Sequence, residues 1–481
     1  MADAKTRRRV LQEAGASAAA LAAWPGLAGA QRRDGPNIVL IIVDTLRADH
    51  VYGNRARTPN IDELMRQGLS FTRCFPEAMP TIPARRSILS GRRVFPFHGW
   101  HPYRGLLSEP GWAPLGDVSV AFTSVLRRHG YWTAYVTDNT GVGFSPPWKR
   151  FRQSVDRFER RGGQYGGTDK GVSERELRHW LPPQMEDAET RDRIRRYLAN
   201  GRYAHDETKS FAARVFRDGA HVLETAKRQQ PFAMVVDTFE PHEPWTPPRK
   251  YVDMYGDPDY RGPEPARPYY APVSRYLSAG EARVLLPRMR ALYAAEVTMT
   301  DRWLGMFLDK LDALRLERDT VIMLVSDHGF FLGDHGLTGK IPTRLHPELI
   351  HVPLIVVHPE GRKRGRKSRY FCSTHDVAPT LLSMAGVRVP RGMDGVDLSR
   401  FFRGRRPPER DYAWGGYANS FYVKTDRWSM FGDNRGGNFH LYNPKRDYRE
   451  HRDLAGSHRG KTRELYRVVR RRGGRLPYFP Y

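Results

Sequence analysis

Residues 36–44 of this 481-residue chain read Pro36-Asn37-Ile38-Val39-Leu40-Ile41-Ile42-Val43-Asp44. Six consecutive apolar side chains without polar alternation are typical of a strand that is buried on both faces of a parallel sheet. The run stops at a carboxylate, Asp44. A helix is expected next over residues 59–67, because Thr58 can cap it, Pro59 suits its first position and Gly68 suits its end.

The same arrangement recurs twice further along the chain. An apolar run over residues 232–236 ends at Asp237, and a second over residues 321–325 ends at Ser326-Asp327-His328-Gly329. A long helix is expected over residues 281–314. Strands that alternate with helices predict an α/β fold with a mixed, mostly parallel sheet flanked by helices. Ligands bind beyond the carboxyl ends of such strands, so three strand-end aspartates predict a shared cation site there.

The composition changes after about residue 400. Aromatic-rich segments at residues 412–422, 428–431 and 439–442 are separated by Gly, Asn and Arg. This pattern predicts a small antiparallel sheet packed on the main domain. We therefore expect a main domain over residues 31–400, and a small C-terminal α+β subdomain with a basic tail over residues 401–481.

The first thirty residues have the features of an export signal. Thr6-Arg7-Arg8-Arg9-Val10-Leu11 leads into an Ala-rich run over residues 14–24, and Ala28-Gly29-Ala30 follows. A basic start, a short apolar middle and a small-residue cleavage site resemble a twin-arginine signal peptide. Residues 1–30 thus predict export to the periplasm or the outside of the cell. No later stretch of about 20 apolar residues occurs, so we expect no transmembrane helix in the mature chain.

The charge is strongly unbalanced. The sequence has 79 Lys and Arg residues against 53 Asp and Glu, a formal net charge of +26 that is spread along the chain. Such a surplus attracts polyanions, including sulfated or phosphorylated polymers; no nucleic acid partner is expected. A basic surface without a dedicated partner is an equally good interpretation. The two cysteines are too few for a disulfide framework or a Cys-rich metal site.

Two groups of residues carry chemistry. Asp44, Asp327 and His328, at strand ends, offer two carboxylates and an imidazole to a divalent cation, with room for a substrate oxygen or a hydroxyl. In the second group, Pro83 marks a helix start that places Thr81 at the positive end of the helix dipole. A hydroxyl there that touches a cation is a competent nucleophile, and Arg85 can bind a tetrahedral anion. Taken alone, the second group also fits a helix cap with a surface arginine.

Several motifs, in order, resemble the sulfatase family over about residues 36–400. The family's nucleophile motif is Cys or Ser, any residue, Pro, any residue, Arg, followed shortly by Gly; here it reads Thr81-Ile82-Pro83-Ala84-Arg85, with Gly91 after it. The other matching motifs are residues 36–44, Thr58-Pro59-Asn60-Ile61-Asp62, Pro241-His242-Glu243-Pro244, residues 326–329, residues 333–336 with Lys340, residues 376–382 and Asp394-Gly395.

The resemblance implies the fold of the alkaline phosphatase superfamily and a role for each matched residue. Asp44, Asp327 and His328 would be metal ligands, with Thr81 completing the shell. Arg85 and Lys340 would neutralise ester oxygens, and His242 would bind or protonate the leaving side. Asn139 and His335 would bind substrate.

Three departures from the family pattern matter. Thr81 carries a methyl group on Cβ, so conversion to formylglycine is not expected, and a threonine alkoxide would instead form a covalent sulfo- or phospho-enzyme. Thr45 stands where many sulfatases have a second aspartate and His328 where many have Asn, which resembles the phosphonate monoester hydrolases and suits Mn or Zn at least as well as Ca. Asp138-Asn139-Thr140 replaces the usual Lys and His, which leaves the leaving-group acid open.

The sequence thus predicts a metal-dependent hydrolase of sulfate or phosphate esters, a sulfuric ester hydrolase in type, with a threonine nucleophile. An alternative is an enzyme like the phosphodiesterases or phosphonate monoester hydrolases, with a second metal ion held by Asp237, His242 and either His335 or His346. An alternative of another class is a non-catalytic module that binds polyanions through its positive charge.

Overall fold

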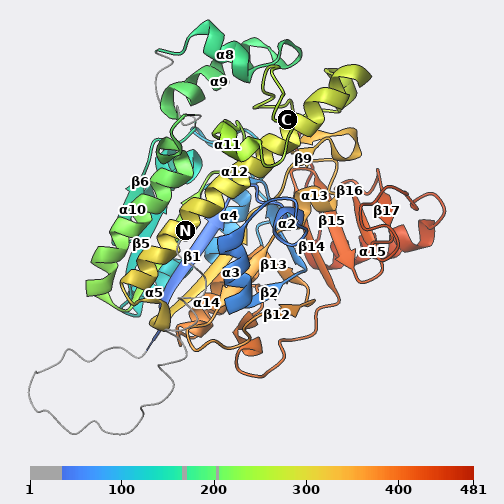
Figure 1. The fold of residues 1–481 in the computed structure, drawn as a ribbon. Helices are drawn as coiled ribbons and strands as arrows, with labels where there is room; N and C mark the ends of the chain where they lie inside the picture. The colour runs from blue at the N-terminus through green and yellow to red at the C-terminus, as the bar shows by residue number, and fades with distance from the viewer. Residues whose placement is uncertain (1–34, 165–170, 202–204, 481) are drawn as a thin grey trace, which may run out of the picture. The chain divides into compact units, whose positions relative to one another are not determined.

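In the computed structural model, strand β1 (Asn37–Val43) lies within an eight-stranded sheet (Figure 1). Its two neighbours, β7 (Phe232–Thr238) and β8 (Thr320–Ser326), both run parallel to it, and all residues of the three strands are buried. Val43 pairs with Thr238 on one side and with Ser326 on the other. The three strands therefore end at one edge of the sheet, as the apolar runs predict.

The sheet is mixed and mostly parallel, in the order β12-β2-β11-β8-β1-β7-β5-β6. Strand β11 is antiparallel to both of its neighbours, and the other neighbouring pairs are parallel. The remaining strands of this sheet are β2 (Leu69–Phe71), β5 (Trp132–Thr137), β6 (Arg157–Arg160), β11 (Leu354–Val357) and β12 (Arg366–Ser368). This confirms the predicted fold class.

Helices cover both faces of the sheet. Successive residues of β1 point to opposite faces, so each face contacts its own set of helices. Val39 and Ile41 of β1 pack in a cluster with α3, α10 and α12, whereas Ile38 and Leu40 pack with α4, α5 and α14. The helices of the first face are α3 (Pro59–Gln67), α10 (Phe211–Ala226) and α12 (Ala279–Ala313). Those of the second face are α4 (Thr81–Ser90), α5 (Phe122–Arg128) and α14 (Val377–Met384).

The structure describes residues 35–164, 171–201 and 205–480, so the predicted signal at residues 1–30 lies outside the described residues. No helix within these ranges is long and apolar enough to cross a lipid bilayer. The shorter helices are α2 (Ala48–Val51), α6 (Thr140–Phe144), α7 (Lys149–Arg152), α8 (Glu174–Trp180), α9 (Ala188–Gly201), α11 (Arg249–Val252) and α13 (Pro347–Ile350). The short strands are β3 (Cys74–Phe75), β9 (Phe331–Leu332), β10 (Thr338–Gly339) and β13 (Cys372–Ser373).

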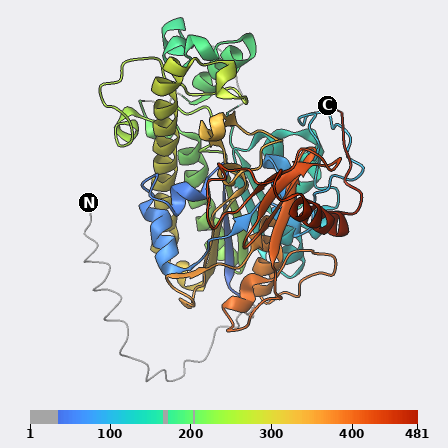
Figure 2. The same ribbon diagram turned by 90° about the vertical axis from the view of Figure 1, so that its right-hand side faces the viewer.

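A second sheet lies beside the first one (Figure 2). Its antiparallel strands are β14 (Tyr412–Tyr417), β15 (Ser420–Thr425), β16 (Ser429–Asp433) and β17 (His440–Tyr442). The fifth strand, β4 (Ala78–Met79), pairs parallel with β14 and comes from the main domain, directly before Pro80-Thr81. The C-terminal sheet therefore includes the segment that leads into the nucleophile motif.

The C-terminal end differs from the predicted basic tail. Residues Arg459–Gly473 form helix α15, with Leu465 and Val469 buried against the C-terminal sheet and Arg470 to Arg472 exposed. Two apolar residues four apart are enough to define one buried helix face. The many arginines around them hid this face from the sequence analysis.

A buried charge cluster joins the C-terminal sheet to the main domain. The Glu450 carboxylate accepts hydrogen bonds from Lys424 of β15 (2.5 Å) and from Nδ1 of His346, which precedes α13 (2.9 Å). Only 2% of Glu450 is exposed. Burial would raise the pKa of Glu450, but Lys424 and His346 lower it to about 2. The ionised carboxylate therefore stabilises the contact between the two parts.

We expect Glu450→Gln to lower the free energy of unfolding at pH 7 by about 3 kcal/mol, because it leaves the buried Lys424 without a counter-charge. The folded pKa lies below that of an unfolded glutamate, about 4.3. The ionic stabilisation is therefore complete above that value and is lost as the pH falls toward 2. Denaturant unfolding at pH 7 and pH 3.5 should show a smaller deficit at pH 3.5.

The control is Asp426→Asn, which removes an exposed carboxylate that pairs with Arg73. It should change stability by less than about 1 kcal/mol at either pH. A deficit of Glu450→Gln that is the same at both pH values would contradict the ionic explanation.

Candidate active site

Asp44 follows β1 directly, and Asp327 and His328 follow β8, so the three side chains meet at the shared strand edge. One ligand atom from each lies within 4.8 Å of the others, and all three residues are fully buried. His328 Nε2 is 3.5 Å from Asp327 Oδ2 and 4.0 Å from Asp44 Oδ1. Among the described residues, this is the one group of three or more His, Cys, Asp and Glu side chains close enough to share an ion.

Thr45 orients both carboxylates. Its backbone N–H donates to Asp327 Oδ1 (2.9 Å), and its hydroxyl donates to Asp44 Oδ1 (2.5 Å). Its φ of 61° lies in the left-handed region, which costs a β-branched residue on the order of 1–3 kcal/mol and is typical of functional sites. The Tyr293 hydroxyl donates to the Thr45 carbonyl (2.7 Å) and helps to hold this conformation. Thr45 thus acts on the site through the two aspartates.

His328 presents a lone pair to the two carboxylates and to Thr81. Its Nδ1–H donates to the Gly329 carbonyl (3.0 Å), which leaves Nε2 unprotonated in the neutral ring. Burial lowers the pKa of His328 to about 4, so the ring is neutral near pH 7. A neutral imidazole with one nitrogen held by a carbonyl is the usual form of a histidine metal ligand.

Thr81 is the first residue of α4 and is 4% exposed. Its Oγ1 lies 3.4 Å from His328 Nε2. The helix begins two residues before Pro83, so the hydroxyl lies at the positive end of the helix dipole, as the sequence predicts. The structure therefore brings Thr81 together with Asp44, Asp327 and His328.

The fully buried guanidinium of Arg85 lies between three aspartates. Nη2 and Nε donate to Asp237 (2.7 and 3.2 Å), while Nη1 donates to Asp327 and lies 3.0 Å from Asp44 Oδ2. Burial alone would lower the pKa of Arg85, but Asp237, Asp327 and Asp44 raise it well above its ordinary value. The resemblance assigns Arg85 to the ester oxygens. In this structure it binds the carboxylates instead, because three strands end in aspartate around it.

Both carboxylate oxygens of Asp237 accept hydrogen bonds from neighbouring side chains. Besides Arg85, the Tyr135 hydroxyl donates to Asp237 Oδ2 (2.7 Å) from the adjacent strand β5. The two-metal alternative needs Asp237 as a ligand of a second ion, and both of its oxygens already accept hydrogen bonds. The arrangement therefore does not support a second ion at Asp237. Sequence reasoning missed Tyr135, because nothing in its strand marks it except its place beside β7.

Lys340 and His242 form a contact of their own. Lys340 Nζ lies 2.7 Å from His242 Nε2, and His242 Nδ1 donates to the Glu243 carbonyl (2.6 Å), so Nε2 accepts from the ammonium. Lys340 is 6% exposed and forms no ion pair with a described carboxylate. Burial and the nearby Lys340 lower the pKa of His242 well below its usual value, which keeps the ring neutral. The buried ammonium thus has no ion pair among the described residues, although its charge lowers the pKa of Asp44.

The donor set fits a divalent cation. Asp44 Oδ2 is buried without a hydrogen-bond partner among the described residues, although Arg85 is near. Burial and the neighbouring Asp327 raise the pKa of Asp44 well above its usual value. Burial opposes ionisation of Asp327 too, but His328 and Arg85 lower its pKa. Three aspartates around one arginine leave an excess of buried negative charge, which a cation between Asp44, Asp327 and His328 would offset.

Asn139 lies at the same edge of the sheet, after β5. Its side-chain oxygen accepts from the Val142 N–H at the start of α6 (3.1 Å), and its buried Nδ2 has no hydrogen-bond partner among the described residues. Gln164, which sequence reasoning missed, donates from Nε2 to the His242 carbonyl (2.8 Å) and helps to place that residue. Because Gln164 is an isolated loop residue, its sequence gives no signal of this role.

His335 is placed differently from its predicted role. Its ring stacks on His346 with a centroid separation of 3.8 Å, and its Nε2 lies 3.2 Å from Glu348. These neighbours belong to the charge cluster at the C-terminal sheet. The structure therefore does not bring His335 into the group formed by Thr81 and the metal ligands.

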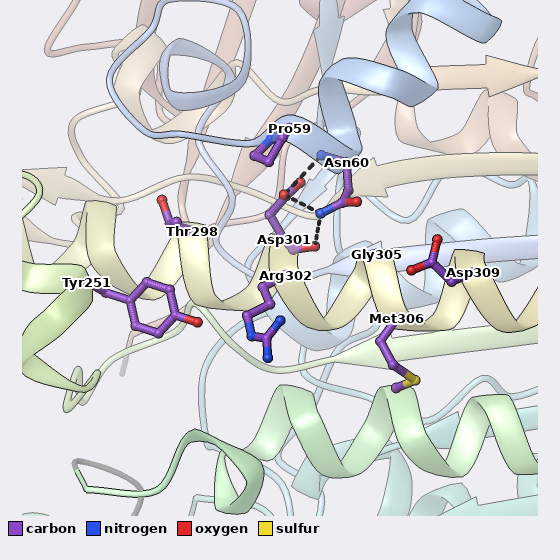
Figure 3. Close-up of a pocket in the computed structure, with 9 residues that line it drawn as sticks. All are labelled: Pro59, Asn60, Tyr251, Thr298, Asp301, Arg302, Gly305, Met306 and Asp309. Carbon is purple, nitrogen blue, oxygen red and sulfur yellow. Dashed lines mark hydrogen bonds between the residues drawn. The ribbon is translucent and has the colours of Figure 1, made fainter. Parts of the chain in front are cut away.

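A surface pocket of about 450 Å³ lies along α12, and none of its lining residues belongs to this group (Figure 3). Asp301 in the pocket accepts the backbone N–H groups of Asn60 and Ile61 (3.1 and 2.8 Å), which begin α3, and Arg302 donates to Glu207 (2.6 Å). These polar groups hold secondary structure together, so the pocket is not a second candidate for the reaction.

Comparisons with known proteins find relatives over most of the chain. The family model described as Sulfatase matches residues 36–387, and the one described as N-sulphoglucosamine sulphohydrolase, C-terminal, matches residues 333–461. An arylsulfatase of Clostridium perfringens is 25% identical over 473 residues, covering 90% of this chain and 92% of its own. An ulvan-active sulfatase of Formosa agariphila is 25% identical over 432 residues, covering 83% and 75%. The structure of a phosphonate monoester hydrolase from Silicibacter pomeroyi shares the fold, with a TM-score of 0.68, 21% identity and coverage of 92% and 96%.

We expect Arg85→Gln to lower the free energy of unfolding by about 3–5 kcal/mol, because it leaves three buried carboxylates without their common cation. Denaturant unfolding with a chelator present measures this. Arg66→Gln, which breaks an exposed pair with Glu63, is the control and should cost less than about 1 kcal/mol. A near-neutral Arg85→Gln would show that the carboxylates do not depend on the guanidinium.

Proposed function

Because the chain belongs to the sulfatase family, we propose that it hydrolyses sulfate or phosphate esters with Thr81 as the nucleophile and a divalent cation held by Asp44, Asp327 and His328. The observation that supports this most directly is the distance of 3.4 Å between Thr81 Oγ1 and His328 Nε2, inside a buried group with two carboxylates. A non-catalytic binding module would not need a nucleophile placed against metal ligands.

Thr81 is prepared for attack by its surroundings. A divalent cation bound beside it would lower the pKa of the hydroxyl and neutralise the ester oxygens. The start of α4 adds the positive end of a helix dipole. Attack by Thr81 Oγ1 on sulfur or phosphorus would give a sulfo- or phospho-threonine, which water then cleaves.

Lys340 and His242 would serve the leaving group. The buried Lys340 ammonium would attract the anionic ester, and its hydrogen bond to neutral His242 lets the pair deliver a proton to the departing oxygen. The Lys and His that many sulfatases carry after β5 are replaced here by Asn139 and its neighbours. The unpaired Nδ2 of Asn139 would donate a hydrogen bond to the substrate.

The relatives include enzymes of both ester classes, so the choice between sulfate and phosphate depends on Thr81 in this proposal. A threonine cannot become formylglycine, and an unmodified hydroxyl favours phosphoryl transfer, whereas the overall similarity favours sulfate. Two carboxylates and an imidazole suit Mn or Zn at least as well as Ca. We further propose that the protein is exported and meets its ester, including esters on polymers, outside the cytoplasm.

We expect Thr81→Val to reduce kcat/KM by about 10³-fold or more, because it keeps the shape of the side chain and removes the nucleophile. Thr81→Ser keeps the hydroxyl and should retain much of the activity. Turnover of matched nitrophenyl sulfate, phosphate monoester and phosphodiester substrates, each with Ca, Mn and Zn, identifies the ester class. Full activity of Thr81→Val on any of them would exclude Thr81 as the nucleophile.

Cation binding should raise thermal stability, since the ion binds the folded site. At a concentration about 100 times Kd the gain should be about 2.7 kcal/mol, reversed by a chelator. Asp44→Asn should abolish this gain and make the metal-free protein more stable than metal-free wild type, because it removes a repelling buried charge. Calorimetry and a metal count per chain test both points.

The control for this experiment is Asp218→Asn, at an exposed pair with Arg161, which should keep the full response to metal. A count of two ions per chain, or a response that survives in Asp44→Asn, would contradict the single-cation site.

A further inference from the structure

Two neighbouring loops carry ten exposed Lys and Arg side chains. We call residues 361–369 and 400–406 together the basic platform. Its cations are Arg362, Lys363, Arg364, Arg366, Lys367, Arg369, Arg400, Arg403, Arg405 and Arg406. The one acidic residue at its border, Glu360, pairs with Arg362. The platform therefore has a large local excess of positive charge.

The two loops form one surface. Arg362 Nη1 donates to the Phe402 carbonyl (3.3 Å), and the His358 ring stacks on Phe402 with a centroid separation of 5.7 Å. The Arg405 N–H donates to the Arg400 carbonyl (2.9 Å), which closes the second loop into a turn. These contacts hold the cations of both loops on the same part of the molecule.

The basic platform begins at the opposite end of the sheet from the active site and continues along β12, at the edge of the sheet three strands from β8. Strand β11 runs antiparallel to β8, so the loop after β11 lies where β8 begins, whereas Asp327 follows the end of β8. Strand β12 runs parallel to β8, so Arg366 and Lys367 lie beside the middle of the sheet. Three strand spacings, about 14 Å at ~4.8 Å each, separate β12 from β8. Figure 1 shows β12 and the loops around it at the lower end of the sheet. The platform and Thr81 are thus separate surfaces.

The platform cations are largely unpaired. Apart from Arg362, the Arg403 side chain donates to the Ser383 carbonyl (2.5 Å). For the other eight, no hydrogen bond or ion pair links the side chain to the part of the chain that the structure describes. Lys and Arg on an edge strand such as β12 also discourage pairing with other chains. Protection of the edge strand explains Arg366 and Lys367. It does not explain the cations in the turn before them or those of the second loop.

We infer that the basic platform binds a linear polyanion that carries sulfate or phosphate groups. Eight of its ten cations are arginine, whose planar guanidinium can donate two parallel hydrogen bonds to such a group. Insertion into a lipid surface would need exposed apolar side chains, and none of the exposed large hydrophobic residues lies in the platform. A polymer held here would keep the protein on the surface of its proposed substrate while the separate active site works on other groups.

The test compares two fourfold variants of equal net charge in a Thr81→Ala background, so that binding is measured without turnover. The platform variant is Lys363→Gln, Arg364→Gln, Lys367→Gln and Arg405→Gln. The control removes four exposed cations of α15, Arg459→Gln, Arg463→Gln, Arg467→Gln and Arg471→Gln. Dextran sulfate and polyphosphate are the probes. At 0.1 M salt, we expect the platform variant to bind about tenfold more weakly and the control to change less than about threefold, since screening confines the effect to within ~10 Å.

Equal weakening in both variants would overturn the inference, because binding would then follow net charge alone. Unchanged binding in the platform variant would overturn it too, as would a platform-dependent preference for vesicles of anionic phospholipid over both polymers. With Thr81 intact, the platform variant should keep its kcat/KM on a small nitrophenyl ester within about twofold. This readout shows that the variant is folded, and it separates the platform from the proposed chemistry.

Discussion

The contact on which the rest of the site depends is the buried guanidinium of Arg85 among Asp44, Asp237 and Asp327. Three parallel strands that end in aspartate bring like charges to one buried edge, which is unfavourable without a cation. Arg85 supplies that cation from the first turns of α4. The contact that offsets the repulsion between the aspartates therefore also holds in place the helix that begins at Thr81. Charge neutralisation at the strand edge thus contributes to the position of Thr81.

The site combines opposite charges in a small buried space. An excess of negative charge lies around Asp44 and Asp327, and the Lys340 ammonium, which is hydrogen-bonded to His242, offsets only part of it. Neither half is stable by itself in a low-dielectric interior. A cation and an anionic ester together would satisfy both. The buried charges that are not fully compensated lower the stability of the folded protein. Such a cost in stability is common at active sites.

The sequence predicted the parts of the molecule that follow from local pattern. The apolar runs located the central strands, and the strand-end residues located Asp44, Asp327 and His328. The motifs predicted roles for Thr81 and Lys340, and the structure places Thr81 beside His328 and Lys340 beside His242. The parts that it missed depend on partners far away in the chain. Thr45 orients two carboxylates through a left-handed backbone, and Tyr135 binds Asp237 across two strands; neither contact has a local signal. The motif assigned Arg85 to the ester oxygens. The three aspartates around it come from different strands and meet only in the folded sheet, so no local pattern predicts them. Helix α15 was not predicted, because its many arginines obscure the apolar face that the helix buries.

The pairing of β4 with β14 has a consequence for how the chain matures. Ala78 and Met79 leave the ribosome more than three hundred residues before the strand that they pair with, and Tyr417 lies opposite Met79. During synthesis, the segment before Thr81 can therefore pair with β14 only after residues 412–417 have been made. A chain truncated before β14 would lack the strand that pairs with β4, and the segment that leads into Thr81 would lose those backbone hydrogen bonds.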